Sequence, residues 1–220
     1  MTAIVIFLLI FLVLWLVIRP RTGVEPIQRF SERKHWALSL AEPMVNAIGM
    51  TGFYDPATHC FEDKSKAFFR APLLHQMGYR NQASDAQIRE HLTSMLERQW
   101  FRFDLDQLGH TDDPRSAMAF ACVRTAFLVR CAMLFDWLPP ETGWRILLLN
   151  AQRAQDCFNS WNELGQAFIT GRQQWVLAFR ADPLGGHFDD NSLTLLQTPQ
   201  KGAWSGLPWH ELPAMNPTTG

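Results

Sequence analysis

Apolar side chains recur at steps of three and four residues along most of the chain beyond residue 30, which is the spacing of one face of an α-helix. No stretch of useful length alternates apolar and polar residues as a strand would. The pattern predicts helices at about residues 31–48, 84–103, 114–138, 140–158, 160–179 and 190–197. We therefore expect an all-α fold, with a single N-terminal transmembrane helix followed by a compact domain of about five to seven helices.

Three of the predicted helices begin at recognisable capping residues. Ser84 and Ser160 each stand three positions before a Gln or a Glu, which is the spacing of a capping box. Asp113 precedes Pro114, and proline is well suited to the first position of a helix. These starts are the best-defined boundaries in the sequence.

Two prolines complicate the first half of the chain. Pro43 is expected to kink or interrupt the first helix, because proline has no N–H to donate. Residues 53–83 contain only short helical stretches, and we expect Pro72 to break them. The sequence leaves the fold of this segment open.

Residues 3–18 form an unbroken run of sixteen apolar side chains. A helix of that length covers roughly 24 Å of the roughly 30 Å hydrocarbon core, and Trp15, Arg19 and Arg21 can extend it into the interface. A cleaved signal peptide needs a basic segment before the run and small residues at a cleavage site after it, and neither is present. We expect a retained anchor whose partner is the lipid bilayer.

Positive charge follows this run and none precedes it. Residues 19–34 contain five Lys or Arg and two Glu. By the positive-inside rule, the N-terminus lies outside and the domain lies in the cytoplasm, at a bacterial inner membrane. The expected division is an anchor at 1–19, a juxtamembrane linker at 20–34, a cytoplasmic all-α domain at 35–210 and a C-terminal tail at 211–220.

Composition narrows the classes of partner. The formal net charge of -1 excludes the strongly basic character of a general nucleic-acid binder, so we expect no nucleic-acid partner. The four cysteines show no CxxC spacing and no clustering with His. In a reducing cytoplasm they are expected to be small core residues without disulfides.

Two arginines interrupt the apolar faces of predicted helices. Arg172 lies on the face that includes Trp161 and Trp175, and Arg124 lies on a face otherwise made of Phe, Cys and Leu. A buried unpaired charge is costly, so each guanidinium needs a carboxylate, several carbonyls or a ligand anion. Either both arginines are structural and pair with acids such as Glu163, or they line a pocket that binds an anion, or they reach the surface.

A short His-Asp echo occurs at residues 109–113 and 186–190. The residues concerned are His110, Asp112, Asp113, His187 and Asp189. Imidazoles and carboxylates at two places could form a divalent metal site. Each copy nevertheless comes directly before a predicted helix, where Asp is the expected N-cap. We therefore predict caps here and no metal site.

Known catalytic motifs are absent. The chain has no HExxH, GxSxG, P-loop or GxGxxG motif, so no cofactor is predicted and catalysis has no positive support. Ser160 is explained by helix capping and has no His near it in sequence. Gly165, about two turns before Arg172, leaves room on that face for a partner helix or a guanidinium.

Several stretches together resemble a known bacterial family. They are Arg124–Arg130, Trp144, SWNELGQAFITGRQQW at 160–175, WSGLPW at 204–209 and HWALSLAEPMVN at 35–46. The pattern is similar to the family catalogued as domain of unknown function 1266, over about residues 35–210. Its most specific part is the Ser-Trp pair followed by Gly-Arg and Trp. That family is known by sequence and not by activity, so the resemblance implies no reaction.

The chain departs from the family pattern at one point. In the family, an Asp preceded by Trp commonly stands three residues before the first arginine, whereas this chain has Phe120 and Ala121 there. The departure removes one candidate partner of Arg124 and weakens the case for acid-dependent chemistry. Many relatives lack an anchor, so the resemblance implies that the apolar run is an addition to this chain.

Two functions remain open. The first is a membrane-anchored cytoplasmic domain that binds a protein or a small anionic partner through a polar core. The residues expected to form that core are Arg124, Arg172, Ser160, Trp161, Glu163 and Trp175. The second is an enzyme of unassigned reaction, such as a hydrolase, with a cleft near the two arginines and His110. A deep cleft containing His and two carboxylates would favour the enzyme, and an exposed Trp-rich patch near the tail would favour binding.

Overall fold

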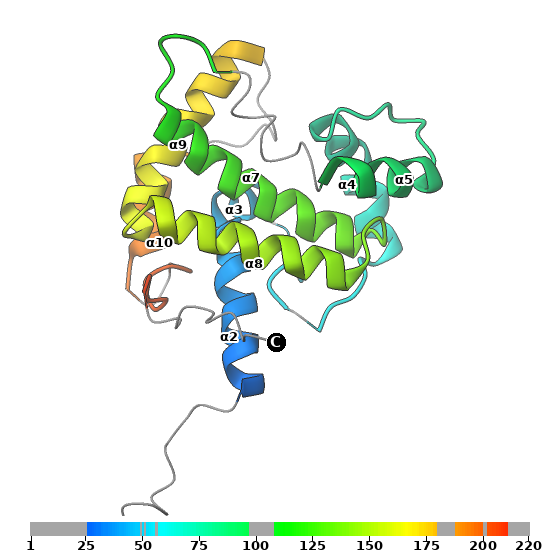
Figure 1. The fold of residues 1–220 in the computed structure, drawn as a ribbon, viewed down its shortest axis with the longest axis horizontal. Helices are drawn as coiled ribbons and strands as arrows, with labels where there is room; N and C mark the ends of the chain where they lie inside the picture. The colour runs from blue at the N-terminus through cyan, green and yellow to red at the C-terminus, as the bar shows by residue number, and fades with distance from the viewer. Residues whose placement is uncertain are drawn as a thin grey trace, which may run out of the picture. The chain divides into compact units, whose positions relative to one another are not determined.

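The computed structural model describes residues 26–48, 50, 52–55, 57–96, 108–179, 188–199 and 202–210. Within them the chain forms eight helices and no strand, which confirms the all-α class (Figure 1). The helices are α2 (Pro26–Ser39), α3 (Glu42–Ile48), α4 (Asp63–Gln76), α5 (Asp85–Leu96), α7 (Pro114–Leu134), α8 (Pro140–Cys157), α9 (Trp161–Phe179) and α10 (Asp190–Gln197). The chain divides into two units after Phe30, and the second unit holds the helical domain.

Helix α7 is the centre of the domain. All of its residues from Ala119 to Leu134 are buried, α3, α8 and α9 pack against it, and α10 packs on α9. Among the described helices only α7 is long and apolar enough to cross a membrane, yet 94% of its most apolar window is buried inside the protein. This helix is therefore the core of the fold. The predicted anchor at residues 3–18 lies outside the described residues.

The predicted interruption at Pro43 is confirmed. Helix α2 ends at Ser39 and α3 begins at Glu42, so Pro43 lies in the first turn of α3, where a missing N–H removes no intrahelical hydrogen bond. Helix α2 begins at Pro26, earlier than the predicted start at Ser31. Part of the segment expected to be a linker is thus helical.

The prediction that Pro72 interrupts the helix was wrong. Helix α4 runs through it, and the proline is exposed on the helix surface. Water can therefore bond the carbonyl that has lost its N–H partner, while Leu73 and Leu74, 1% and 0% exposed, hold the other side of the helix in the core. Packing overrides the local preference.

The ends of α7 and α5 were predicted near residues 138 and 103. Helix α7 ends at Leu134 and not near residue 138, because Asp136 adopts a positive φ of 58° that turns the chain before the two prolines. Helix α5 is described to Leu96, and its predicted end near Phe103 lies outside the described residues.

Two glycines let α9 approach its neighbours closely. A Cβ atom on Gly171 would lie 2.1 Å from the main-chain oxygen of Ser116 in α7. A Cβ atom on Gly165 would lie 2.3 Å from Cδ1 of Leu193 in α10, so the room expected at Gly165 is filled by a partner helix. Gly171 is the stricter case, because the atom opposite belongs to a helix backbone.

We expect Gly171→Ala to lower the free energy of unfolding by about 2 kcal/mol or more, because the new methyl group forces α9 away from α7. The gain in helix propensity, up to about 1 kcal/mol, offsets only part of this loss. Gly206→Ala is the matched control, since nothing lies within 4 Å of its new Cβ atom. Urea unfolding followed by circular dichroism measures both variants, and equal midpoints would contradict the close approach.

Candidate functional site

Arg124 is buried in α7 and joins two other helices to it. The residue is 5% exposed. Its Nη2 atom donates to the main-chain oxygen of Gln76 at the end of α4, 2.6 Å away. The last carbonyls of a helix carry partial negative charge and lack intrahelical partners, so they are suitable acceptors for a cation. The guanidinium also lies over Trp175 of α9, with 4.9 Å between Cζ and the ring centroid. The sequence left open whether Arg124 is paired with a carboxylate, carbonyls or a ligand anion, and the structure shows a carbonyl as one partner.

Arg172 is half-buried on α9, the helix that packs on α7. Trp175, three residues further along α9, is the ring over which Arg124 lies, so the structure brings the two predicted faces together. Phe120 of α7 stacks on the same ring at 5.2 Å. It occupies one of the two positions at which this chain departs from the family pattern, and Ala121 at the other is fully buried.

Ser160 and Glu163 cap α9. The hydroxyl of Ser160 accepts from the N–H of Glu163 at 3.1 Å, and the carboxylate of Glu163 accepts from the N–H of Asn159 at 2.7 Å. Glu163 also pairs with Arg115 in the first turn of α7. The hydrogen bond from the N–H of Asn159 and then the interaction with Arg115 hold the pKa of Glu163 below its usual range. The ion pair of Arg115 and Glu163 links the starts of α7 and α9.

Trp161 belongs to a cluster of four buried tryptophans. Its ring stacks on Trp204 at 4.9 Å and meets Trp36 and Trp209 at 4.8 Å. Each indole N–H donates to a carbonyl: Trp36 to Pro208, Trp161 to Leu207, Trp204 to Ser39 and Trp209 to Phe158. The segment 204–209 thus closes over α2 and α9. Its two tryptophans are 3% and 6% exposed and form no exposed binding patch.

The His-Asp stretches cap helices, as predicted. Asp113 accepts from the N–H of Ser116 and Asp189 accepts from the N–H of Ser192, both at 2.9 Å. The hydrogen bonds from Ser116 and Ser192 hold the pKa values of both carboxyls below the usual range. Their charges are used to start α7 and α10.

The structure does not bring His110 and Arg124 into one cleft. His110 is exposed in the turn before α7, whereas Arg124 lies ten residues into that helix, roughly 15 Å along its axis. Asp112 accepts from the N–H of Gly109 at 2.7 Å, and His187 lies outside the described residues. Within the part of the chain that the structure describes, no three His, Cys, Asp or Glu side chains are grouped to hold a metal ion.

The most deeply buried arginine of the described residues was not singled out by the sequence. Arg130 is 1% exposed, and its guanidinium donates to the carbonyls of Phe53, Asp55 and Thr58 at 3.0, 2.6 and 2.9 Å. Burial lowers its pKa, but the three acceptors compensate its charge. The signal was available, because Arg130 stands in the sequence between the apolar runs 126–129 and 131–134.

Further polar groups surround the loop that Arg130 holds. Lys34 and Arg130 both lie over Trp144, with Nζ and Cζ at 4.5 and 5.7 Å from the ring centroid. Burial and then the charge of Arg130 lower the pKa of Lys34. On the loop itself, the hydroxyl of Tyr54 donates to the buried carboxyl of Glu42. Burial raises the pKa of Glu42, and the hydrogen bond from Tyr54 acts in the opposite direction.

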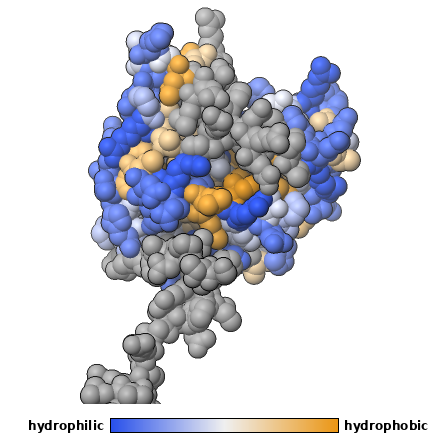
Figure 2. Space-filling view, viewed as in Figure 1, coloured by the Kyte–Doolittle hydropathy of each residue, from blue (hydrophilic) through white to orange (hydrophobic). Residues whose placement is uncertain are grey.

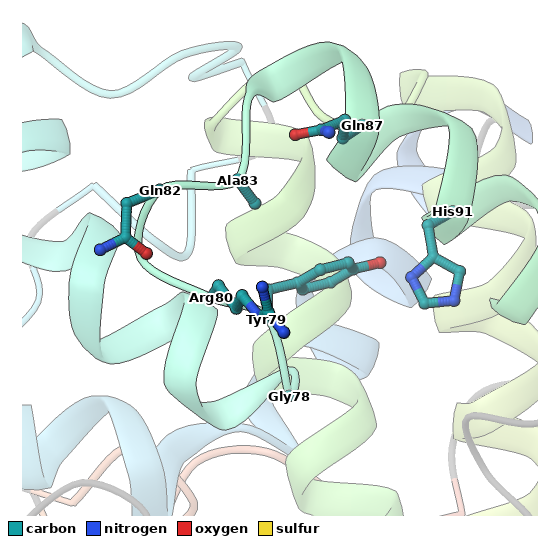
Figure 3. A pocket seen from close by; sticks show the side chains of 7 residues that line it. All are labelled: Gly78, Tyr79, Arg80, Gln82, Ala83, Gln87 and His91. Atoms are coloured by element: carbon teal, nitrogen blue, oxygen red, sulfur yellow. The ribbon is translucent and has the colours of Figure 1, made fainter.

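A pocket of about 480 Å³ lies at the turn between α4 and α5, here called the hairpin pocket (Figure 3). It is lined by Gly78, Tyr79, Arg80, Gln82, Ala83, Gln87 and His91. The rings of Tyr79 and His91 meet edge to face, 5.2 Å apart. Burial raises the pKa of Tyr79 to about 12, and its hydroxyl oxygen is buried with no hydrogen-bond partner among the described residues. Sequence reasoning missed this pocket, because residues 53–83 carry no clear periodicity.

The chain belongs to the DUF1266 family, whose model, described as a protein of unknown function, matches residues 47–209. The match spans α7 with its buried arginines, the motif at 160–175 and the segment 204–209, which confirms the resemblance over those stretches. The stretch 35–46, which was also expected to belong to the family, lies before the match. No curated protein matches the chain, and no solved structure matches it.

We expect Arg130→Met to lower the free energy of unfolding by about 3 kcal/mol or more, because it leaves loop carbonyls without a donor. Arg89→Met is the matched control. Arg89 also bonds a carbonyl and a carboxylate, both of Asp136, but these side chains are 48% and 76% exposed, so its loss should cost less than about 1 kcal/mol. Denaturant unfolding gives the stabilities, and amide exchange at residues 52–58 reports the loop. Unchanged exchange would contradict the anchoring role.

Glu42→Gln is expected to change the pH dependence of stability. A raised folded-state pKa means that the contribution of Glu42 is fully present below the ordinary value of about 4.3 and is lost as pH rises through the raised value. Gln stays neutral and keeps an oxygen for Tyr54. The variant should therefore gain stability relative to the natural chain as the pH rises above about 4. Glu141→Gln, at an exposed site, is the control. A difference in the free energy of unfolding between Glu42→Gln and the natural chain that stays the same at every pH would contradict the ionisation of Glu42 in a buried position.

Proposed function

We propose that this chain is a membrane-tethered, cytoplasmic recognition domain whose α4–α5 hairpin binds a protein partner. The observation that carries the proposal is that the hairpin combines a strongly exposed aromatic ring, Phe68, with the open hairpin pocket, whose lining has no carboxylate. Phe68 is exposed and the pocket is open in the folded domain, so neither needs a rearrangement of the core to be reached.

The hairpin is anchored to the core at several points. Arg124 of α7 donates to the end of α4 at Gln76, and Arg89 of α5 pairs with Asp136 just after α7, at 3.0 Å. A recognition element that is already fixed in place loses less conformational entropy when it binds. In this view the buried arginine of the predicted polar core supports the binding element and is not itself the binding group.

Phe68 is the strongest candidate for an anchor in an interface. The large apolar side chains that are most exposed in the described part of the chain are Phe68 at 71%, Leu149 at 58%, Leu177 at 80% and Leu195 at 61%. They lie on four different helices, and Phe68 alone is aromatic. Figure 2 shows apolar residues set among hydrophilic ones on one face of the molecule. Aromatic residues are enriched in the energetically important parts of interfaces.

The tether is proposed from residues 3–18 and from the basic residues that follow them. A tether confines the domain near the bilayer and raises its effective concentration toward membrane-associated partners. The proposed partner is therefore a protein that is itself at the membrane.

Site-specific photo-cross-linking of the full-length chain in cells tests the proposal. A benzophenone amino acid in place of Phe68 is expected to give a discrete adduct in the membrane fraction. The same amino acid in place of Leu149, an exposed side chain on α8, is the matched control and is expected to give none. Absence of an adduct from position 68, or equal adducts from both positions, would contradict the assignment of the hairpin.

A further inference from the structure

We propose that the hairpin pocket binds a carboxylate side chain on an acidic segment of the partner, with Arg80 and the hydroxyl of Tyr79 as the groups that hold it. This inference rests on the proposed function, because it names the chemistry of the partner at the same hairpin. Nothing in the family description assigns a ligand to these residues.

The lining of the pocket selects for an anion. Arg80 is an exposed cation, and a guanidinium can bind both oxygens of a carboxylate in one plane. Gln87 uses its amide oxygen to accept from the N–H of Ser84 at 2.9 Å, so the NH₂ group is the end it can offer to a ligand. Asp85, which lies two residues from both Ala83 and Gln87, pairs with Arg70, and this reduces its repulsion of an incoming anion.

Tyr79 supplies the second donor. Its hydroxyl oxygen is buried and unpartnered among the described residues, and leaving such a group unsatisfied is costly. An incoming carboxylate oxygen would accept its hydrogen bond. Figure 3 shows the hydroxyl end of Tyr79 directed toward His91, an exposed residue. The ring of His91 meets that of Tyr79, so binding of a carboxylate to this buried hydroxyl requires His91 to change rotamer.

The pocket fits a carboxylate better than a phosphate. It contains one guanidinium, which matches a single negative charge, whereas a phosphate monoester carries about 1.5 to 2 negative charges at neutral pH. A pocket so open gives little to a free ion, because water screens the contact. A carboxylate carried on a peptide gains additional contacts from the neighbouring backbone and the glutamine amides.

The chain has two tyrosines, and this makes a direct test possible. Full-length protein in nanodiscs is labelled with ring-¹³C tyrosine, and Tyr79→Phe identifies the Tyr79 signal. An oligoglutamate peptide is expected to shift that signal saturably and to leave the Tyr54 signal in place. Oligoglutamine of the same length is expected to shift neither.

Variants give the expected affinities. Anisotropy of dye-labelled oligoglutamate should show that Arg80→Gln weakens binding at least about tenfold and Tyr79→Phe about fivefold. Lys64→Gln, an exposed cation of α4 outside the pocket, should leave binding unchanged. Tyr79→Phe should not lower the unfolding midpoint, because the hydroxyl makes no hydrogen bond to any residue that the structure describes.

Three results would overturn the inference: an unmoved Tyr79 signal, equal binding by Arg80→Gln, or a shift caused by inorganic phosphate and not by the peptide. The cross-link from position 68 does not depend on any of them. If that adduct forms while the peptide fails to bind, the hairpin remains the recognition element and only the acidic chemistry of the pocket is wrong.

Discussion

The domain depends on guanidinium groups in the interior of α7 that bond main-chain carbonyls of other segments. Arg124 takes the end of α4, and Arg130 takes three carbonyls of the loop at 53–58. A carbonyl that is buried without a donor is unfavourable, and so is a cation buried without acceptors, so each group compensates the other. Irregular backbone can then pack directly on the central helix. The position of Tyr79 follows from the same interaction, because it lies three residues beyond the carbonyl that Arg124 holds.

The sequence predicted best those elements whose local signals agree with their surroundings. Helices α9 and α10 have capping residues at their starts and one apolar face each, and both occur where expected. Helix α4 was missed because Pro72 argues against a helix. The helix continues through Pro72 because Leu73 and Leu74 pack in the core. For the candidate site, the caps at Ser160 and Asp113 could be predicted from their side chains. The partners of the buried arginines could not, because every residue has a carbonyl and an acceptor of that kind leaves no mark in the sequence. The hairpin pocket likewise arises from a turn without periodicity.

The unit that folds extends beyond the segment that defines the family. The family match begins at residue 47, yet Trp36 of α2 lies before it and is 1% exposed among the other tryptophans of the cluster. The part of α2 from Ser31 onward is therefore an integral part of the core. Residues between the predicted anchor and the family segment therefore also stabilise the domain.

The tryptophan cluster also sets the order in which the domain can be completed. The indole N–H of Trp36 bonds a carbonyl that lies 172 residues later in the chain. On the ribosome, α2 emerges early and then waits, with an unshielded indole, until the segment 204–209 has been synthesised and released. Closure of the domain must therefore follow synthesis of nearly all of it. Until then the nascent chain exposes aromatic surface that favours aggregation, and this interval is when chaperones would matter most.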